Sequence, residues 1–187
     1  MEILNNAPMS KYTSFRCGGS AKRLVICETV SELKEIMNEI AESKENHLFL
    51  GNGSNTLFLD GEYDGTVVTL GKGFDDVEFI EEEDGPRLKC MAASLLSKIA
   101  RKALAESLAG FEFASGIPGS IGGAVFMNAG AYGGEIVDVL ESVELLSPNE
   151  EGRWELKTVP AEELELAYRH SRLQETKELV PLGGRGR

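Results

Sequence analysis

The N-terminal third of the chain alternates short apolar runs with one amphipathic segment. Residues 24–27 (LVIC) and 47–50 (HLFL) are apolar runs of strand length, and such runs predict buried strands. A capping-box pattern begins at Thr29 and indicates the start of a helix. We expect this helix to run from about Val30 to Glu42. Its apolar residues recur at helical spacing, with Glu and Lys on the other face: Val30, Leu33, Met37 and Ile40.

Downstream, strand patterns and turn residues dominate the sequence. The tripeptide Tyr63-Asp64-Gly65 predicts a turn. The acidic run at 81–84 is interpreted as a solvated hairpin turn, because metal loops with oxygen ligands space their carboxylates apart. The strands that we expect occupy residues 66–70, 77–80, 87–92, 142–146 and 154–158. The last two would form a hairpin around residues 148–152.

Two further helices and one more strand complete the predicted elements. Ser94 is placed to cap the first of these two helices. The inward side chains of that helix would be Leu95, Ile99, Ala103 and Leu108. Pro160 suits the first turn of a second, short helix. Leu179 begins a strand, but Pro181 follows it, so we do not expect the tail to Arg187 to complete a core element.

Strand and helix alternation followed by β-rich sequence predicts an α+β fold. A chain of 187 residues holds one large domain or two small ones. We expect two subdomains, residues 1–72 and 73–187, joined near Gly71–Phe74.

Charge and cysteine content argue against several functional classes. The formal net charge is −12 and the basic residues are scattered, which argues against a general nucleic-acid or anionic-membrane binder. Three widely spaced cysteines and two histidines favour neither a disulfide framework nor a zinc site. The N-terminus is polar, and no apolar run nears membrane-spanning length. We therefore expect a cytoplasmic protein.

The stretch from Gly110 to Glu135 is dense in glycine. It holds eight glycines and no Lys or Arg, and its other residues are largely apolar, unlike the polar composition of a flexible linker. One interpretation is a cofactor cradle in which main-chain amides hold a phosphate. The other is a set of tight turns and bulges in a β-rich domain, and the residue pattern leaves both open.

A second glycine cluster, GNGSN at 51–55, follows the predicted strand at 47–50. The dinucleotide-binding fingerprint fails because Thr56 stands where its third glycine would fall. The next residues, TLFLD, are strand-like and do not open a helix. We therefore interpret GNGSN as a phosphate-binding turn between two strands.

Near the C-terminus, residues 168–171 (YRHS) place titratable side chains directly after the short helix. These side chains suit a site loop. The alternative is an ordinary helix C-terminus whose basic residues interact favourably with the helix dipole.

These motifs, in the order GNGSN, Gly110–Glu135 and YRHS, resemble the UDP-N-acetylenolpyruvoylglucosamine reductase (UDP-N-acetylmuramate dehydrogenase) family. Residues 11–19 fit the same family, and the similarity covers residues 5–180. The resemblance implies an FAD-binding fold of the vanillyl-alcohol-oxidase (PCMH) type, with two α+β subdomains and a third, substrate-binding domain further on. It also implies FAD as cofactor, NADPH as hydride donor and a UDP-sugar enolpyruvyl ether as substrate.

The resemblance further implies roles for individual residues. Arg169 matches the family's catalytic arginine, whose guanidinium would stabilise negative charge that builds on the substrate carboxylate. Tyr132 and Tyr168 would lie near the nucleotide-sugar substrate. The flavin ring would be approached by Asn128, Ala129 and Gly130. The FAD pyrophosphate and ribityl chain would be lined by Gly51, Asn52, Gly53, Ser54, Asn55, Ser115, Gly116, Ile117, Pro118, Gly119, Ser120, Gly122 and Gly123. The two glycine clusters would then face a common cleft.

The chain departs from the family pattern at its end. The family's proton-donating serine and assisting glutamate belong to the later domain, whereas this sequence stops at Arg187. Ser171 is no substitute, because it matches the serine of the Tyr-Arg-x-Ser motif. We therefore expect partial FAD affinity without turnover, with a non-catalytic FAD- or nucleotide-binding fragment as the alternative. A covalent flavin oxidase is disfavoured, because such oxidases commonly use a histidine in the first glycine loop and GNGSN has none.

Overall fold

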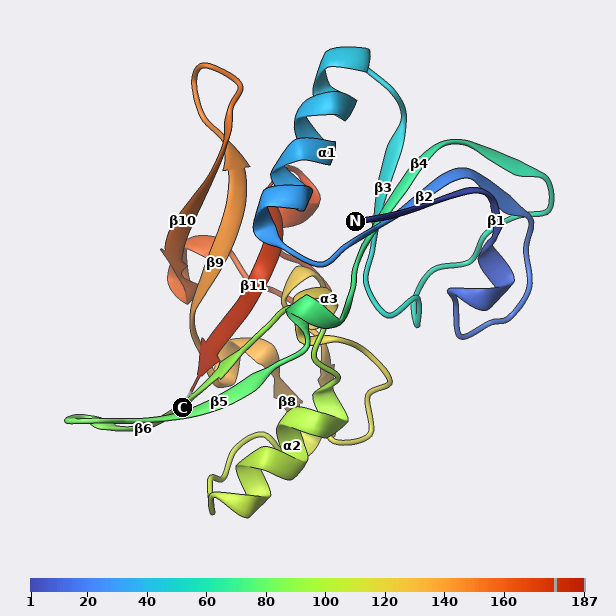
Figure 1. The fold of residues 1–187 in the computed structure, drawn as a ribbon. Helices are drawn as coiled ribbons and strands as arrows, with labels where there is room; N and C mark the ends of the chain where they lie inside the picture. The colour runs from blue at the N-terminus through green and yellow to red at the C-terminus, as the bar shows by residue number, and fades with distance from the viewer. Residues whose placement is uncertain (177, 187) are drawn as a thin grey trace. The chain divides into compact units, whose positions relative to one another are not determined.

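The computed structural model describes residues 1–176 and 178–186, which form two compact units, Met1–Gly73 and Phe74–Arg187 (Figure 1). The boundary between the two units falls between Gly73 and Phe74. Among the described residues, no helix is both long and apolar enough to span a bilayer.

The first unit is a four-stranded mixed sheet with one helix. The sheet order is β1-β2-β4-β3, in which β1 is antiparallel to β2 while β2 and β3 are parallel to β4. The bounds are β1 Glu2–Pro8, β2 Ser20–Cys27, α1 Val30–Ser43, β3 His47–Leu50 and β4 Glu62–Leu70. The predicted helix and the strands at 24–27 and 47–50 are thereby confirmed.

Helix α1 begins where the capping pattern predicted. The Thr29 Oγ1 accepts a hydrogen bond from the Glu32 backbone N–H at 3.2 Å, which satisfies one of the unpaired donors of the first turn. The helix ends at Ser43, and its C-cap residue Lys44 has a left-handed backbone. Its buried positions are Leu33, Ile36, Met37 and Ile40.

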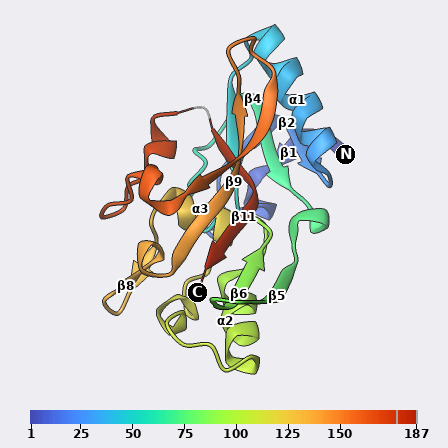
Figure 2. The same ribbon diagram turned by 90° about the vertical axis from the view of Figure 1, so that its left-hand side faces the viewer.

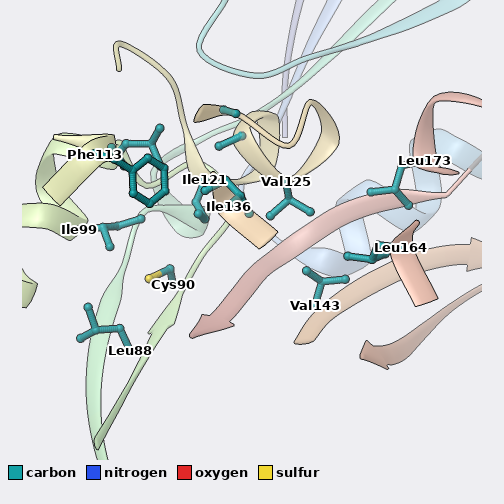
Figure 3. Packing of buried hydrophobic residues seen from close by; sticks show 14 of the residues in the cluster. Leu88, Cys90, Ile99, Phe113, Ile121, Val125, Ile136, Val143, Leu164 and Leu173 are labelled. Carbon is teal, nitrogen blue, oxygen red and sulfur yellow. The ribbon is translucent and has the colours of Figure 1, made fainter. Parts of the chain in front are cut away.

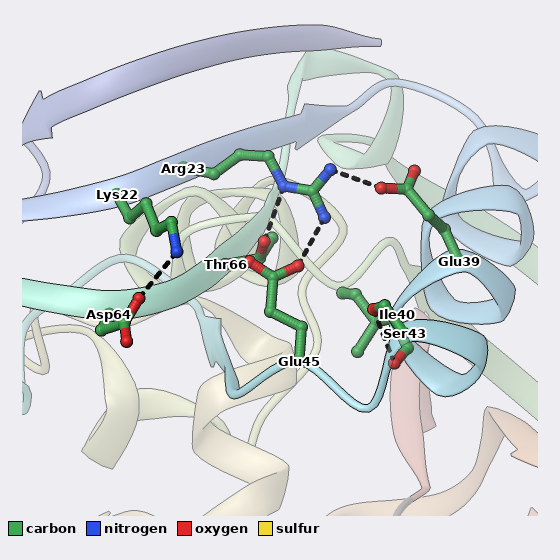
Figure 4. A network of polar contacts seen from close by, with 8 residues as sticks. All are labelled: Lys22, Arg23, Glu39, Ile40, Ser43, Glu45, Asp64 and Thr66. Carbon is green, nitrogen blue, oxygen red and sulfur yellow. Dashed lines mark hydrogen bonds and ion pairs between the residues drawn. The ribbon is translucent and has the colours of Figure 1, made fainter.

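A polar network ties the helix to the sheet (Figure 4). The Arg23 Nε donates to Thr66 Oγ1 at 2.7 Å, which joins β2 to β4. Its Nη1 lies 2.5 Å from Glu39 on α1, and its Nη2 lies 2.9 Å from Glu45 in the following loop. One guanidinium therefore fixes four segments of the first unit.

Two predictions for this unit are wrong. Residues 63–65 do not form a turn but lie inside β4, where the pairing with β2 shifts register between Ala21 and Arg23. This irregularity absorbs the turn-favouring residues. Residues 56–59 form no strand. They run beside the Gly18–Ser20 loop, where Gly19 N–H donates to Leu59 O at 2.9 Å, and Leu59 is 81% exposed.

The second unit is built on a five-stranded antiparallel sheet of order β10-β9-β11-β6-β5 (Figure 2). Its strands are β5 Val77–Glu82, β6 Gly85–Cys90, β9 Leu140–Pro148, β10 Trp154–Pro160 and β11 Leu179–Gly186. Both predicted hairpins are confirmed. The remaining elements are α2 Leu96–Ala105, α3 Ile121–Phe126, β7 Gly130–Ala131 and β8 Gly134–Glu135.

The core of this unit joins the sheet to the helices and to the glycine-rich stretch (Figure 3). Ile121 and Val125 from α3 pack in one cluster with Val143 of β9 and with Ile99 of α2. The glycine-rich stretch is therefore ordered and partly buried, as its apolar residues indicated.

The prediction for the tail is wrong. Strand β11 lies between β9 and β6 and so occupies the middle of the sheet. Its pairing with β9 shifts register between Leu179 and Gly183, so Pro181 falls in an irregular segment where its missing N–H does not interrupt a regular ladder.

Helix α2 also differs from its prediction. Its N-cap is Leu95, which is 41% exposed and does not point inward. Ser94 does not cap it, because its Oγ donates to Asp76 O at 2.9 Å. The buried positions Ile99 and Ala103 are confirmed. The predicted short helix near Pro160 is a 3-10 helix, Ala161–Leu164, with Pro160 as its N-cap.

Candidate functional site

In the first unit, the GNGSN turn follows β3 and is held by close backbone packing. Gly53 has φ +63, and a Cβ at this position would lie 2.1 Å from Tyr12 O, so only glycine fits. The Gly53 carbonyl accepts from Ser14 N–H at 3.0 Å. Within the described residues, the backbone N–H groups of Gly53, Ser54 and Asn55 donate no hydrogen bond. Three successive amides of one turn thus lack a partner within the described residues, and two of them belong to the half-buried Ser54 and the exposed Asn55, as in a turn that binds an anion.

In the second unit, the Ser115–Gly123 segment leads into α3. The first amides of that helix are occupied by the protein, since Ile121 N–H donates to Ser94 O and Gly122 N–H donates to Ala92 O, both at 2.9 Å. The N-cap residue Ser120 makes no side-chain capping bond. Gly116 is exposed, and a Cβ there would meet nothing within 4 Å. Open space therefore lies beside Gly116.

Asn128 is a buried junction just after α3. It is fully buried with φ +40. Its Nδ2 donates to Glu135 Oε2 and to Ala167 O, both at 2.9 Å, and its Oδ1 accepts from Val137 N–H at 3.0 Å. These three bonds use both donors and the acceptor. The Asn128 side chain therefore holds the loop together. Its predicted approach to a flavin would have to be made by its backbone.

The strands β7 and β8 form a small hairpin between Asn128 and Glu135. Tyr132 and Gly133 at its tip have φ +53 and +88, the positive values that a two-residue hairpin turn favours. Tyr132 is 98% exposed. The hairpin therefore presents an aromatic ring to solvent, in keeping with a binding role.

The YRHS motif is a tight turn. Ala167 and His170 exchange two backbone hydrogen bonds, of 3.1 and 3.0 Å, and Arg169 between them has φ +54. The preceding 3-10 helix ends at Leu164, and Glu165 after it is left-handed. The interpretation of YRHS as a helix C-terminus is therefore wrong, and the motif forms a loop.

The structure brings this loop to the glycine-rich stretch. The Arg169 Nη2 donates to Gly130 O at 3.1 Å, and its Cζ lies 5.7 Å from the centroid of the exposed Tyr168 ring, within cation–π range. Ser171 is fully buried, and its Oγ donates to Phe126 O at 2.6 Å. The predicted residues Arg169, Tyr168 and Gly130 thus form one constellation.

Two residues of this region escaped the sequence analysis. Gln174 donates to Phe126 O at 3.2 Å and to Arg169 O at 3.1 Å. Glu135 binds Asn128 and also accepts from the Asp138 backbone N–H, while its own N–H donates to Asp138 Oδ2 at 2.8 Å. The Glu-x-x-Asp spacing of this reciprocal cap was visible in the sequence, whereas nothing in the sequence pointed to Gln174.

The GNGSN turn belongs to the first unit, and the other predicted site residues belong to the second. The expectation that the two glycine clusters face a common cleft concerns both units and stays a prediction.

The sequence of this chain is also similar to those of known proteins. The FAD binding domain family matches residues 21–154. The UDP-N-acetylenolpyruvoylglucosamine reductase of Alkaliphilus oremlandii is 44% identical over 172 residues, which is 92% of this chain and 54% of that protein. The reductase of the same name from Listeria innocua is 45% identical over 175 residues, 94% of this chain and 56% of its own. The chain thus spans about half the length of the curated relatives it matches.

Solved structures agree on the fold. A crystal structure of UDP-N-acetylenolpyruvylglucosamine reductase from Thermus caldophilus superposes with a TM-score of 0.74 and 33% identity, covering 100% of this chain and 60% of that one. A solvent-stable cholesterol oxidase superposes with a TM-score of 0.73 at 11% identity, which shows a shared fold alone. The predicted α+β FAD-binding fold is confirmed.

Proposed function

Because this chain belongs to the FAD binding domain family, we propose that it is the flavin-binding part of a UDP-N-acetylenolpyruvoylglucosamine reductase. Such a reductase would convert UDP-N-acetylglucosamine enolpyruvate to UDP-N-acetylmuramate, with NADPH as hydride donor, for peptidoglycan precursor and cell-wall synthesis. The observation that carries this proposal is the similarity to reductases at 44% and 45% identity over more than nine-tenths of the chain. Residues 1–72 and 73–187 would be the two FAD-binding subdomains, and the reaction would be cytoplasmic.

The residues present suit the phosphates of FAD. Gly53, Ser54 and Asn55 offer backbone N–H groups that are unused within the described residues, and a turn of successive amides binds anions without a cationic side chain. Gly116 adds an exposed backbone with open space beside it. This donor set also suits a strongly acidic protein, because it needs no excess of Lys or Arg.

When bound, FAD would supply hydride-transfer chemistry between NADPH and the enolpyruvyl ether. The chain's own contribution would be charge and shape. Arg169 offers a guanidinium, held at Gly130 and Tyr168, whose remaining N–H groups make no hydrogen bond with the described residues. A guanidinium stabilises the negative charge that builds on a carboxylate during reduction. The exposed rings of Tyr132 and Tyr168 would contact the nucleotide sugar.

The experiment is a titration of the purified chain with FAD, followed by flavin absorbance and by quenching of flavin fluorescence. We expect saturable binding that weakens in Ser54→Pro, because proline removes one of the amide donors. Absence of FAD binding would refute the proposal.

The second candidate is a non-catalytic FAD- or nucleotide-binding module. The free amides of the GNGSN turn favour it as much as they favour the reductase. The two candidates predict different effects of Arg169→Lys. In a reductase, this substitution should weaken binding of the enolpyruvyl substrate. In a simple binding module, it should leave ligand binding unchanged.

A further inference from the structure

The backbone of Arg169 is held in an unfavourable conformation. Its φ of +54 lies in the left-handed region, where non-glycine residues are uncommon. Such conformations persist only where the surrounding structure over-determines them, and they concentrate at functional sites. The side chains that hold this turn in place therefore affect the role of Arg169.

Gln174 reaches the turn from outside it. Its Nε2 lies 3.1 Å from Arg169 O and 3.2 Å from Phe126 O, with Met127 Sδ at 3.7 Å. A primary amide carries two N–H donors, so one side chain serves both carbonyls. Gln174 thereby links the backbone of the strained residue to the C-terminal end of α3.

The end of α3 is a suitable anchor. Carbonyls in the last turn of a helix lack intrahelical partners and take donors from elsewhere. Phe126 O receives two such donors, from Gln174 and from Ser171 Oγ at 2.6 Å. Asn128 Nδ2 fixes the other side of the turn through Ala167 O at 2.9 Å.

We propose that Gln174 is a positioning residue that holds Arg169 in its left-handed conformation and so sets the direction of its guanidinium. This assignment rests on the proposed function, because it gains its meaning from Arg169 acting on the substrate. The held guanidinium keeps one N–H on Gly130 O at 3.1 Å and its plane near the Tyr168 ring. Its other N–H groups are left for an anionic ligand.

The test uses NMR relaxation on the chain without ligand. Gln174→Met keeps the length of the side chain and removes both donors. We expect the order parameter of the Arg169 backbone amide to fall from about 0.85 to below about 0.6. The Arg169 Nε–Hε resonance, identified by its loss in Arg169→Lys, should move toward the position of flexible arginines. The melting temperature is measured on the same variant. If Gln174 had a merely structural role, its loss would change the melting temperature but not the Arg169 signals.

Glu163→Met on the exposed side of the 3-10 helix is the matched control, and it should leave the Arg169 signals unchanged. If Gln174→Met does not fold, Gln174→Glu replaces the donors with acceptors at equal size and should give the same local loosening. Unchanged Arg169 signals in a folded Gln174 variant would overturn the proposal. An FAD titration of the wild-type chain separates this outcome from failure of the proposed function, because the Arg169 signals can be measured whether or not FAD binds.

Discussion

At the scale of single residues, the two glycine clusters use glycine for different reasons. Gly53 is required by its positive φ and by the closeness of Tyr12 O, whereas a Cβ at Gly116 would have no neighbour within 4 Å. The first glycine therefore serves the fold, and the second leaves space that a ligand would use. Alanine at each position separates these roles.

We expect Gly53→Ala to lower the free energy of unfolding by at least about 1 kcal/mol, from the left-handed backbone alone. Gly116→Ala should change it by less than about 0.5 kcal/mol while weakening FAD binding. Urea unfolding gives the first quantity and flavin titration the second. Equal stability of the two variants would contradict this assignment of roles.

The three thiols should differ in reactivity. Burial raises the pKa of Cys27 to about 11 and that of Cys90 to about 12, and the thiolate is the reactive form. Cys17 is exposed. We expect one fast equivalent with a thiol-specific disulfide reagent at mildly alkaline pH, absent in Cys17→Ser, and all three equivalents in denaturant. A second fast thiol in the native protein would show that one buried site opens readily.

At the scale of elements, caps and ion pairs fix where segments start and how they attach. Thr29→Ala removes the Oγ1 that accepts from Glu32 N–H at 3.2 Å. Loss of an N-cap typically lowers stability by about 1 kcal/mol, and we expect that loss by chemical unfolding. Thr29→Ser keeps the acceptor and should stay within a few tenths of a kcal/mol, so equal losses in both variants would exclude capping as the cause.

Glu178, just before β11, links strand β10 to the segment after YRHS. Burial opposes its ionisation, but the ammonium of Lys157, the guanidinium of Arg172 and the Thr176 hydroxyl together hold the pKa of its carboxyl below the ordinary value of 4.5. A carboxyl whose folded-state pKa is lowered adds stability above its unfolded pKa and loses it as pH falls through the folded pKa.

Glu178→Gln should therefore be less stable than the wild type at neutral pH, and the difference should shrink as the pH drops below about 4.5. Thermal unfolding from neutral pH down to about pH 3 measures it. The exposed Glu162→Gln is the control and should track the wild type throughout. A difference that stays constant with pH would mean that Glu178 acts through packing and not through charge.

At the scale of the whole molecule, the sequence predicted the elements whose formation depends on local residue patterns. Helix α1 and both hairpins followed from periodicity and turn residues, and the FAD-binding fold followed from long motifs. The middle position of β11 did not follow, because its partners are set by pairings with distant strands and Pro181 argued against a strand. Gln174 was missed for the same reason, since its acceptor Phe126 O lies 48 residues upstream.

The place of β11 has a consequence for synthesis. Hairpins β5–β6 and β9–β10 are synthesised before residues 179–186, and each must present an unpaired inner edge until β11 arrives between them. Open edges of this kind invite pairing with other chains, and pairings across long sequence distances form slowly. The nascent second unit therefore passes through a vulnerable interval that closes only after β11 has emerged, and chaperone dependence during translation should centre on that interval.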